Sequence, residues 1–271
     1  MEVSFWGVRG SLPCAGVDYS RYGGNTSCVL VMCGRVPIIL DSGTGIRSLG
    51  ESLASRNLLE CHLLYSHVHW DHIMGFPFFS PLYSPNATVN IRCGNLLPGR
   101  KIKEILSLQM SRPNFPIGLE DLSASLDFTD FDAGESFDIC TGINVMTAAL
   151  NHPDGATGYR ITYRSKSVCY ITDTEHTPGV LDLPLVDFLR GADLLIYDST
   201  YNDTNFSSFK GWGHSTWQEG VRLARAADVK KFAIFHHDLT STDDILDRVA
   251  MEAKLLFPNS FVAAEGLSIS V

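Results

Sequence analysis

Residues 63–72 restrict the fold of this 271-residue chain more than any other segment. The segment begins with an apolar run, residues 63–65, which predicts a buried strand. Four potential metal ligands follow within six residues: His67, His69, Asp71 and His72. Neutral imidazoles and carboxylates are the ligands that zinc and similar divalent ions favour. We therefore expect a fold in which the turn after this strand carries the ligands of a metal site.

The spacing of these ligands divides them into two pairs. His67 and His69 are two residues apart, so in an extended turn their side chains point the same way and share one ion. Asp71 and His72 follow where we expect the chain to turn into a helix, which redirects both toward a second ion. The pattern predicts two neighbouring metal sites.

The string from His67 to His72 resembles the HxHxDH signature of the metallo-β-lactamase superfamily. In that superfamily the first two histidines serve one metal, and the aspartate and the following histidine serve the other. The resemblance implies an α/β fold, the four-layer αβ/βα sandwich of two mixed β-sheets flanked by helices. It also implies a metal-dependent hydrolase with its metals at the edge where the sheets meet.

The resemblance further implies three later ligands, each after a predicted strand. His152 follows residues 143–150 and matches the third histidine of the first site, and Asp173 matches the bridging aspartate. The last ligand is one of two adjacent histidines, His236 and His237, which follow the predicted strand of residues 231–235. If the strand continues, their side chains face opposite ways, so only one of them can bind the metal. The match to the ribonuclease Z branch favours His236, which leaves His237 as a substrate contact, a residue behind the ligands or a surface residue.

Two more motifs resemble the ribonuclease Z-like phosphodiesterase branch. Residues 213–216 resemble its His-Ser-Thr motif, and residues 191–201 resemble a strand that ends in an acidic residue, usually Glu and here Asp198. Near Asp198, His214 can donate a hydrogen bond to a phosphate oxygen or protonate a leaving oxygen, and Asp71 is the best candidate to orient or deprotonate the attacking water. Residues 213–216 also fit a helix start, because either Ser215 with Gln218 or Thr216 with Glu219 fits a capping box, and the two interpretations are compatible.

Two residues outside the ligand set are candidates for supporting roles. Asp41, in a Gly-rich turn, is placed either to accept the free N–H of a ligating imidazole or to form an Asx turn. Arg9 either presents the N–H donors of its guanidinium to a substrate phosphate or is a solvated surface residue.

The predicted cofactors are two divalent metal ions, with zinc expected and manganese or iron as alternatives. The net charge of −9 opposes attraction to long nucleic acid, and the chain shows no Gly/Pro-rich arm like that of the transfer-RNA processing enzymes. We therefore predict a phosphodiesterase acting on a small or cyclic nucleotide or a related small-molecule phosphodiester. The alternatives are a hydrolase of the same fold for a lactone, thioester or β-lactam, a tRNA 3'-processing-type endoribonuclease, and a non-catalytic metal-binding module.

The chain is expected to form a single domain, residues 1–271, because the predicted ligands run from residue 67 to residue 236 and no linker divides them. No apolar run approaches a membrane span, and the start lacks a basic signal-peptide region, so we expect a cytoplasmic protein; a homodimer is left open. Apolar periodicity predicts helices over 45–56, 101–110, 215–227 and 243–256. Strands are predicted near 2–8, 28–32, 36–40, 61–65, 88–92, 126–131, 143–149, 159–163, 168–172, 194–197, 232–235 and 267–271.

Overall fold

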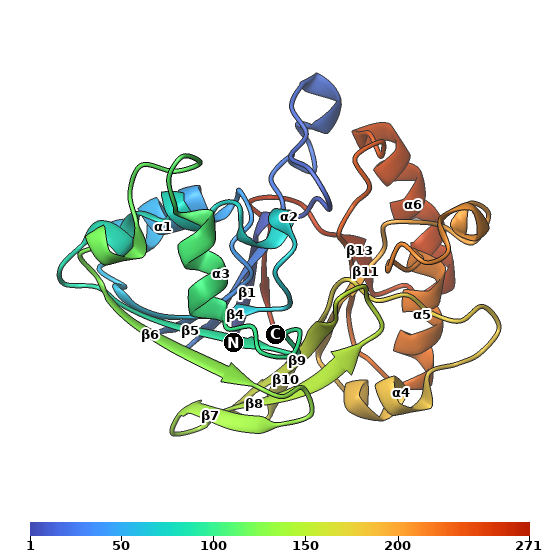
Figure 1. Ribbon diagram of the computed structural model, residues 1–271. Coiled ribbons are helices and arrows are strands. Elements are labelled where there is room, and N and C mark those ends of the chain that lie inside the picture. Colours follow the sequence, from blue (N-terminus) through green and yellow to red (C-terminus); the bar gives the residue numbers. More distant parts are fainter.

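Two seven-stranded β-sheets form the centre of the computed structural model, which describes residues 1–271 (Figure 1). The first sheet has the order β14-β1-β2-β3-β4-β5-β6. Its strands are β1 (Glu2–Gly7), β2 (Cys28–Cys33), β3 (Val36–Leu40), β4 (Glu60–Tyr65), β5 (Thr88–Gly94), β6 (Ser125–Phe131) and β14 (Ser268–Ser270). The second sheet has the order β13-β12-β11-β10-β9-β8-β7. Its strands are β7 (Ser136–Cys140), β8 (Ile143–Leu150), β9 (Ala156–Tyr163), β10 (Lys166–Ile171), β11 (Leu194–Asp198), β12 (Phe232–Phe235) and β13 (Ser260–Val262).

Both sheets are mixed and have the same arrangement. In the first, β3 to β6 are parallel and β1, β2 and β14 join by antiparallel pairing. In the second, β10 to β13 are parallel and β7 to β9 are antiparallel. The parallel strands matter for function because their carboxyl ends lie at one edge of each sheet, where ligand sites of α/β proteins form.

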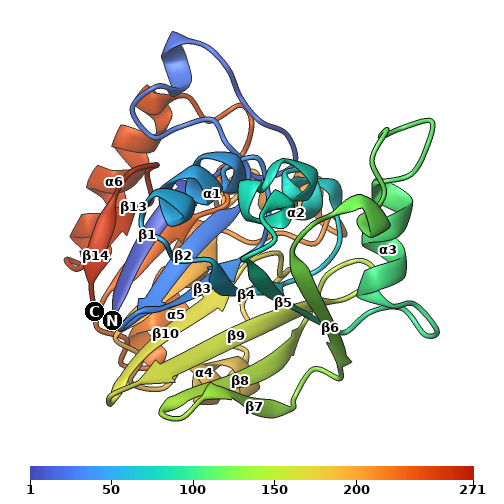
Figure 2. The ribbon, with the colours of Figure 1, turned by 90° about the vertical axis from the view of Figure 1, so that its left-hand side faces the viewer.

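Helices cover the outer face of each sheet (Figures 1 and 2). The helices are α1 (Ile46–Ser55), α2 (Trp70–Ile73), α3 (Ile102–Gln109), α4 (Leu183–Leu189), α5 (Trp217–Ala226) and α6 (Asp243–Leu256). One apolar cluster joins α1 and α3 to the first sheet, a second joins α4, α5 and α6 to the second sheet, and a third fills the space between the sheets. The predicted four-layer αβ/βα sandwich is confirmed.

Strand β4 shows how the sequence produces these layers. Its side chains alternate between the two faces of the sheet, as in any strand. Leu63 and Tyr65 pack in the cluster beneath α1 and α3, whereas Leu64 packs between the sheets. Because both faces are covered here, Leu63, Leu64 and Tyr65 form a continuous apolar run, which is typical of parallel sheets. The strand therefore holds the residues that follow it in a rigid position.

The four predicted helices correspond to α1, α3, α5 and α6, with ends that differ by at most two residues from the expected ranges. Thr216 caps α5, since its hydroxyl accepts a hydrogen bond from the backbone N–H of Glu219 at 3.1 Å. The predicted strands are also found, whereas β7, β13 and α4 were not predicted. No helix combines the length and hydropathy needed to span a bilayer, and the longest, α6, has 14 residues.

Candidate metal centre

The first four predicted ligands follow β4, where the chain changes from extended to helical. His69 has extended backbone angles and precedes α2, which begins at Trp70. His67 and His69 therefore lie on the extended part of the turn, whereas Asp71 and His72 lie on the helix, as the sequence predicted. The change of direction separates the two pairs of side chains.

The other predicted ligands leave the ends of three strands of the second sheet. His152 follows β8, Asp173 follows β10 and His236 follows β12. Asp173 and His236 have positive φ angles, 54° and 60°, a left-handed conformation that non-glycine residues adopt at a cost of about 1–3 kcal/mol. The left-handed turn ends each strand abruptly and directs the side chain toward the edge where the two sheets meet.

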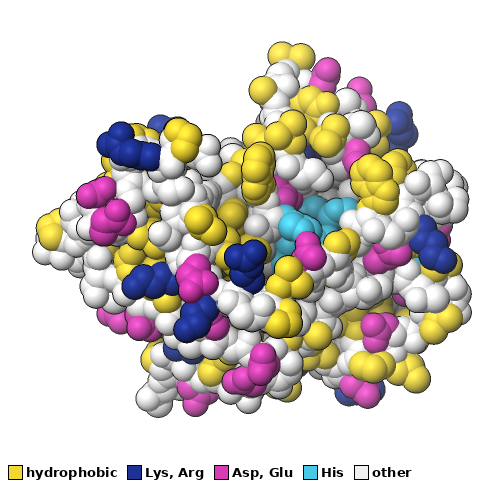
Figure 3. Space-filling view, viewed as in Figure 1, with side chains coloured by type: hydrophobic (Ala, Val, Ile, Leu, Met, Phe, Trp, Pro, Cys, Tyr) yellow, Lys and Arg dark blue, Asp and Glu magenta, His cyan; other side chains and the backbone are white.

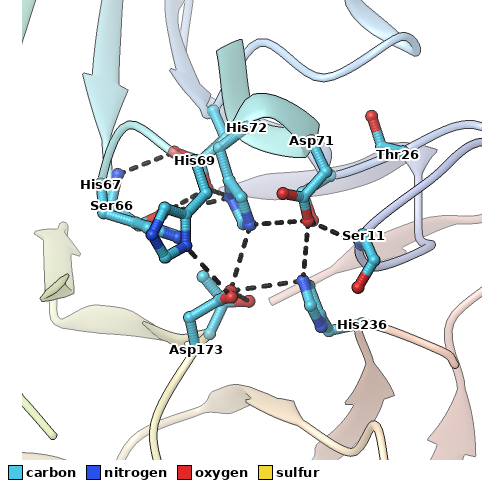
Figure 4. Close-up of polar contacts among 12 residues, drawn as sticks. Ser11, Thr26, Ser66, His67, His69, Asp71, His72, Asp173 and His236 are labelled. Carbon is cyan, nitrogen blue, oxygen red and sulfur yellow. Dashed lines mark hydrogen bonds and ion pairs between the residues drawn. The ribbon is translucent and has the colours of Figure 1, made fainter. Parts of the chain in front are cut away.

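The carboxylate of Asp173 lies at the centre of the site (Figure 4). Its Oδ1 is 3.7 Å from Nε2 of both His67 and His152. Its Oδ2 is 3.2 Å from Nε2 of His72 and 3.3 Å from Nε2 of His236. Each carboxylate oxygen therefore faces a different group of imidazoles, which is the geometry expected of a bridging ligand.

Five overlapping groups of three side chains could hold a metal ion, and two of them correspond to the two predicted metal sites. In each group the nitrogen and oxygen atoms lie within 4.8 Å of one another. The first group is His67, His69 and His152, and the second is Asp71, His72 and His236. Six imidazoles surround Asp173, with neighbouring ring centroids 4.2 to 5.4 Å apart: His67, His69, His152, His214, His236 and His72. Figure 3 shows that histidine side chains gather in one hollow of the surface.

Hydrogen bonds from Nδ1 orient four of these imidazoles so that Nε2 faces the centre. His72 donates to Asp41 Oδ2 at 2.8 Å, as predicted, and His152 donates to the carbonyl of Gly213 at 2.7 Å. His67 Nδ1 contacts the hydroxyl of Ser66 at 3.1 Å, and His236 Nδ1 contacts the hydroxyl of Thr200 at 2.9 Å. Such partners fix the tautomer and the orientation of metal-ligating histidines.

The sequence did not point to Ser66 and Thr200. Each hydroxyl already donates to a carboxylate, Ser66 to Asp41 and Thr200 to Asp198, so each is left to accept the proton of the imidazole. The one available signal was their position directly beside predicted site residues, Ser66 before His67 and Thr200 two residues after Asp198.

The residues present fit divalent metal ions. Nε2 of His67 and Nε2 of His72 are fully buried and have no hydrogen-bond partner. Because His72 donates from Nδ1, a neutral His72 turns a lone pair toward carboxylate oxygens 3.1 and 3.2 Å away, an arrangement that a cation stabilises. Burial alone would lower the pKa of His72, but Asp71, Asp173 and Asp41 raise it well above its usual value. The carboxylates around His72 therefore stabilise a positive charge at this position.

Two imidazoles of the first group, His67 and His152, are instead suited to remain neutral. Burial lowers the pKa of His67 well below its usual value, and the neighbouring His72 lowers it further. Burial also lowers the pKa of His152. A neutral imidazole is the form that binds a metal.

Two glycines leave room for the ligands. A Cβ atom on Gly10 would lie 2.3 Å from Cε1 of His236, and one on Gly213 would lie 2.3 Å from Nδ1 of His152. Gly213 also has a positive φ of 83°. The loop that contains Gly10 contributes directly to the site, because the backbone N–H of Ser11 donates to Asp71 Oδ2 at 2.8 Å (Figure 4). In Figure 1 this loop, between β1 and β2, projects above α2.

His214 lies beside the ligands and is held by Asp198. Its Nδ1 is 3.0 Å from Asp198 Oδ2 and 3.7 Å from Asp173 Oδ1. Burial lowers the pKa of His214, but Asp198 and then Asp173 and Asp71 outweigh burial and raise it to about 9. Asp198 is itself buried beneath His214 and accepts two further hydrogen bonds from Thr200. Asp198 therefore orients His214 and does not reach the surface.

Arg9 does not have the position predicted for a substrate contact. Its side chain is fully buried and donates to the backbone carbonyls of Gly23, Asp238 and Ser241. The guanidinium joins the loop after β1 to the segment after β12, and the ring of Tyr19 covers it at 4.9 Å. The prediction that Arg9 contacts a substrate phosphate is wrong. The sequence did not reveal its true partners because Asp238 and Ser241 are far from Arg9 along the chain.

His237 is also buried and does not face the cluster of ligands. Its Nε2 donates to the carbonyl of Ala263 at 2.8 Å, and its ring lies edge to face with the ring of Tyr22. Burial, together with Arg9, lowers its pKa to about 3. Of the two adjacent histidines, only His236 faces Asp71 and Asp173, so His237 is a packing residue and the prediction of a substrate contact is wrong.

Comparisons with known proteins agree with this geometry. The model of the beta-lactamase superfamily domain matches residues 38–237. The chain belongs to the beta-lactamase superfamily. A ribonuclease Z of Haloarcula marismortui is 23% identical over 307 aligned positions, which cover 98% of this chain and 94% of the relative. Many similar relatives carry the same name, including one from Bradyrhizobium that is 26% identical over 97% of each chain.

Solved structures share the fold of this chain. The metallo-beta-lactamase fold protein YhfI from Bacillus subtilis has a TM-score of 0.73 and 19% identity, covering 99% of this chain and 98% of its own. A diphosphatase of the PhnP family has a TM-score of 0.73 and 18% identity, covering 100% and 97%. With its histidine and aspartate clusters, this member of the beta-lactamase superfamily is a metal-dependent hydrolase.

Proposed function

We propose that this protein is a phosphodiesterase that uses two divalent metal ions, zinc in the first instance and manganese or iron as alternatives, to hydrolyse a small or cyclic nucleotide or a related small phosphodiester. The observation that carries the proposal is the pairing of His214 with Asp198 at 3.0 Å, directly beside the metal ligands. We assign the first ion to His67, His69 and His152, the second to Asp71, His72 and His236, and the bridge to Asp173.

His214 is placed to act as the general acid. Its Nδ1 is engaged by Asp198, whereas Nε2 bonds to no protein atom and is not fully covered. When the P–O bond breaks, Nε2 can give its proton to the departing alkoxide oxygen, which leaves as an alcohol. A thioester hydrolase would not need such a donor to the same degree, because a thiolate leaves more easily than an alkoxide.

Asp71 is placed to orient the attacking water. Its Oδ2 accepts the backbone N–H of Ser11 and faces His72 and His236, while Oδ1 has no partner in the protein and is not fully covered. Oδ1 can therefore accept a hydrogen bond from water and orient it for attack. Bound divalent ions would supply the remaining chemistry, by lowering the pKa of water and neutralising charge on the phosphoryl oxygens.

A structured RNA is the second candidate substrate because many full-length relatives are named ribonuclease Z. Two observations favour a smaller one. The alignment with the Haloarcula relative extends over 307 positions although this chain has 271 residues, so the relative contains segments that this chain lacks. The net charge of −9 also weakens attraction to a polyphosphate backbone.

The test compares phosphodiesters that differ only in their leaving group, using protein whose metal content has been measured. Replacing His214 with Ala should lower kcat by about 10²- to 10⁴-fold for an alkyl ester, which needs a proton on its leaving oxygen. The same variant should lose far less activity on a 4-nitrophenyl ester, whose leaving group is stable as an anion. Lactones, thioesters and a precursor tRNA complete the panel.

The matched control is His176→Ala. His176 is also a part-buried imidazole and bonds to Ser215 Oγ, but it belongs to neither group of ligand atoms. Its replacement should leave the dependence on the leaving group unchanged. Equal losses for both esters in His214→Ala would refute the acid role, and efficient turnover of lactones or thioesters without turnover of phosphodiesters would refute the proposed substrate class.

A further inference from the structure

A pocket of about 170 Å³ opens directly beside the first group of ligands. His67 and His69 line the pocket, together with Asn95, Leu96, Leu97 and Arg100 of the loop between β5 and α3. For comparison, an apolar cavity of about 150 Å³ holds one benzene ring. The pocket is therefore large enough for one ring-sized group of a substrate that is bound at the metal centre.

The pocket is lined by apolar side chains and by one cationic side chain. The apolar part consists of Val68, Leu96, Leu97 and Ile105. The cation is Arg100, whose backbone N–H bonds to the carbonyl of Leu97 but whose guanidinium forms no hydrogen bond or ion pair in the protein. Figure 3 shows a basic side chain next to the histidine patch. A free guanidinium at the rim of an apolar pocket is suited to a carboxylate or phosphate carried by a ring or short chain.

The loop that carries Arg100 is attached to the turn that carries His152. Asn95 has a positive φ of 54° and its side-chain amide donates to the carbonyl of Ala156 at 3.0 Å. At the other end of the loop, the backbone N–H of Ile102 donates to Asp130 Oδ1 at 2.9 Å. Both ends of the loop are therefore fixed, so the fold sets the position of the Arg100 backbone relative to the ligands.

The pocket and the general acid lie on different sides of the metal centre. His152 separates His69 from His214 in the ring of imidazoles, with centroid distances of 4.9 Å and 5.4 Å. A phosphodiester with its leaving oxygen at His214 therefore points its other ester group, the one that stays on phosphorus, toward His67, His69 and the pocket.

We propose that this pocket binds the retained ester group of the substrate, and that Arg100 selects substrates in which that group carries an anion. The inference rests on the proposed phosphodiesterase activity and specifies its substrate class: diesters with a ring-sized retained group that bears a carboxylate or a phosphate. Asp154 is the one carboxylate that lines the pocket, and it forms no ion pair with Arg100, so Arg100 remains free to pair with a ligand.

The test uses two substrates with the same leaving group, 4-nitrophenyl phenyl phosphate and 4-nitrophenyl 4-carboxyphenyl phosphate. The wild-type protein should prefer the carboxylated diester, and Arg100→Gln should lower the ratio of the two kcat/KM values by about tenfold, mainly through KM. Arg100→Glu should reverse the preference. Arg56→Gln is the control, since Arg56 is another exposed arginine without an ion pair and lies outside the pocket.

A binding experiment separates failure of this inference from failure of the proposed function. Titration calorimetry with phenylphosphonate and 4-carboxyphenylphosphonate needs no turnover. If the carboxylated ligand binds more tightly to the wild type and this advantage disappears in Arg100→Gln, the pocket assignment stands even if no diester is hydrolysed. An unchanged ratio of kcat/KM values in Arg100→Gln, or an equal loss of affinity for both phosphonates, would overturn it.

Discussion

Asp41 gives the most quantitative prediction, because its buried carboxylate connects the fold to the metal centre. Its Oδ2 accepts hydrogen bonds from the hydroxyls of Ser66 and Tyr170 and from Nδ1 of His72, each at 2.8 Å. Its Oδ1 accepts the backbone N–H of Ser66 at 2.7 Å. Asp41→Asn preserves the shape but replaces one of these oxygens with an NH₂ group, which cannot accept.

The least disruptive orientation of the asparagine keeps its oxygen at the position of Oδ2. The NH₂ group then faces the N–H of Ser66, and an unsatisfied buried donor costs about 1–3 kcal/mol. Loss of the charged acceptor weakens the other three bonds, so we expect a total loss of about 2–4 kcal/mol in the free energy of unfolding. Because His72 is less firmly held, metal affinity should also fall, by about 10- to 100-fold.

The two effects are measured separately. Urea unfolding of metal-stripped protein reports the loss of stability, and competition with a chromophoric chelator reports metal affinity. Tyr170→Phe is the control, since it removes only one of the four bonds and should cost about 1 kcal/mol. If Asp41→Asn is no less stable than Tyr170→Phe and binds metal as tightly as the wild type, the argument that Asp41 fixes the orientation of His72 is refuted.

Two further predictions concern a ligand and a distant ion pair. Gly10→Ala should displace His236, because the ring of His236 lies 2.3 Å from the position of the added Cβ. Elemental analysis should then find about half of the wild-type metal content, while the circular dichroism spectrum stays unchanged. Full metal content would contradict this. Burial raises the pKa of Asp193, but the amines of Lys230 and Lys166 and the N–H of Ser167 lower it below its usual value overall. The stability that Asp193 contributes is therefore present above its unfolded-state pKa of about 3.9 and is lost as the pH falls through the lower folded-state value. Asp193→Asn should cost about 1 kcal/mol at pH 7, and urea unfolding should show that this difference shrinks below pH ~4; a constant difference would refute the assignment.

The parts of the site that could be predicted from the sequence are those determined by local chain geometry. The spacing of His67, His69, Asp71 and His72 requires only an extended turn followed by a helix, and both are present. His152 and Asp173 each lie one residue beyond the position that follows a strand, β8 or β10, so the sequence placed them at the edge of a sheet. The choice between His236 and His237 could not be made from alternation alone, because the left-handed backbone at His236 interrupts it.

The errors arise from long-range packing. Arg9 contacts Asp238 and Ser241, more than 200 positions away, and nothing local to Arg9 indicates that the two loops meet. Helix α4 was not predicted, although its start carries two favourable signals: Pro184 lies in the first turn, and Asp182 caps the helix by accepting the N–H of Leu185. Sequence periodicity identifies elements that bury one face, whereas it does not identify which loops cover one another.

The central claim is that the two oxygens of Asp173 face two metal ions held by separate groups of imidazoles. Anomalous diffraction from crystals of the metal-loaded protein, recorded on both sides of the zinc, iron and manganese absorption edges, tests it most directly. We predict two anomalous peaks, one bounded by His67, His69 and His152 and the other by Asp71, His72 and His236, with Asp173 between them. A single peak, or imidazoles that point away from Asp173 in protein with full metal content, would contradict the claim.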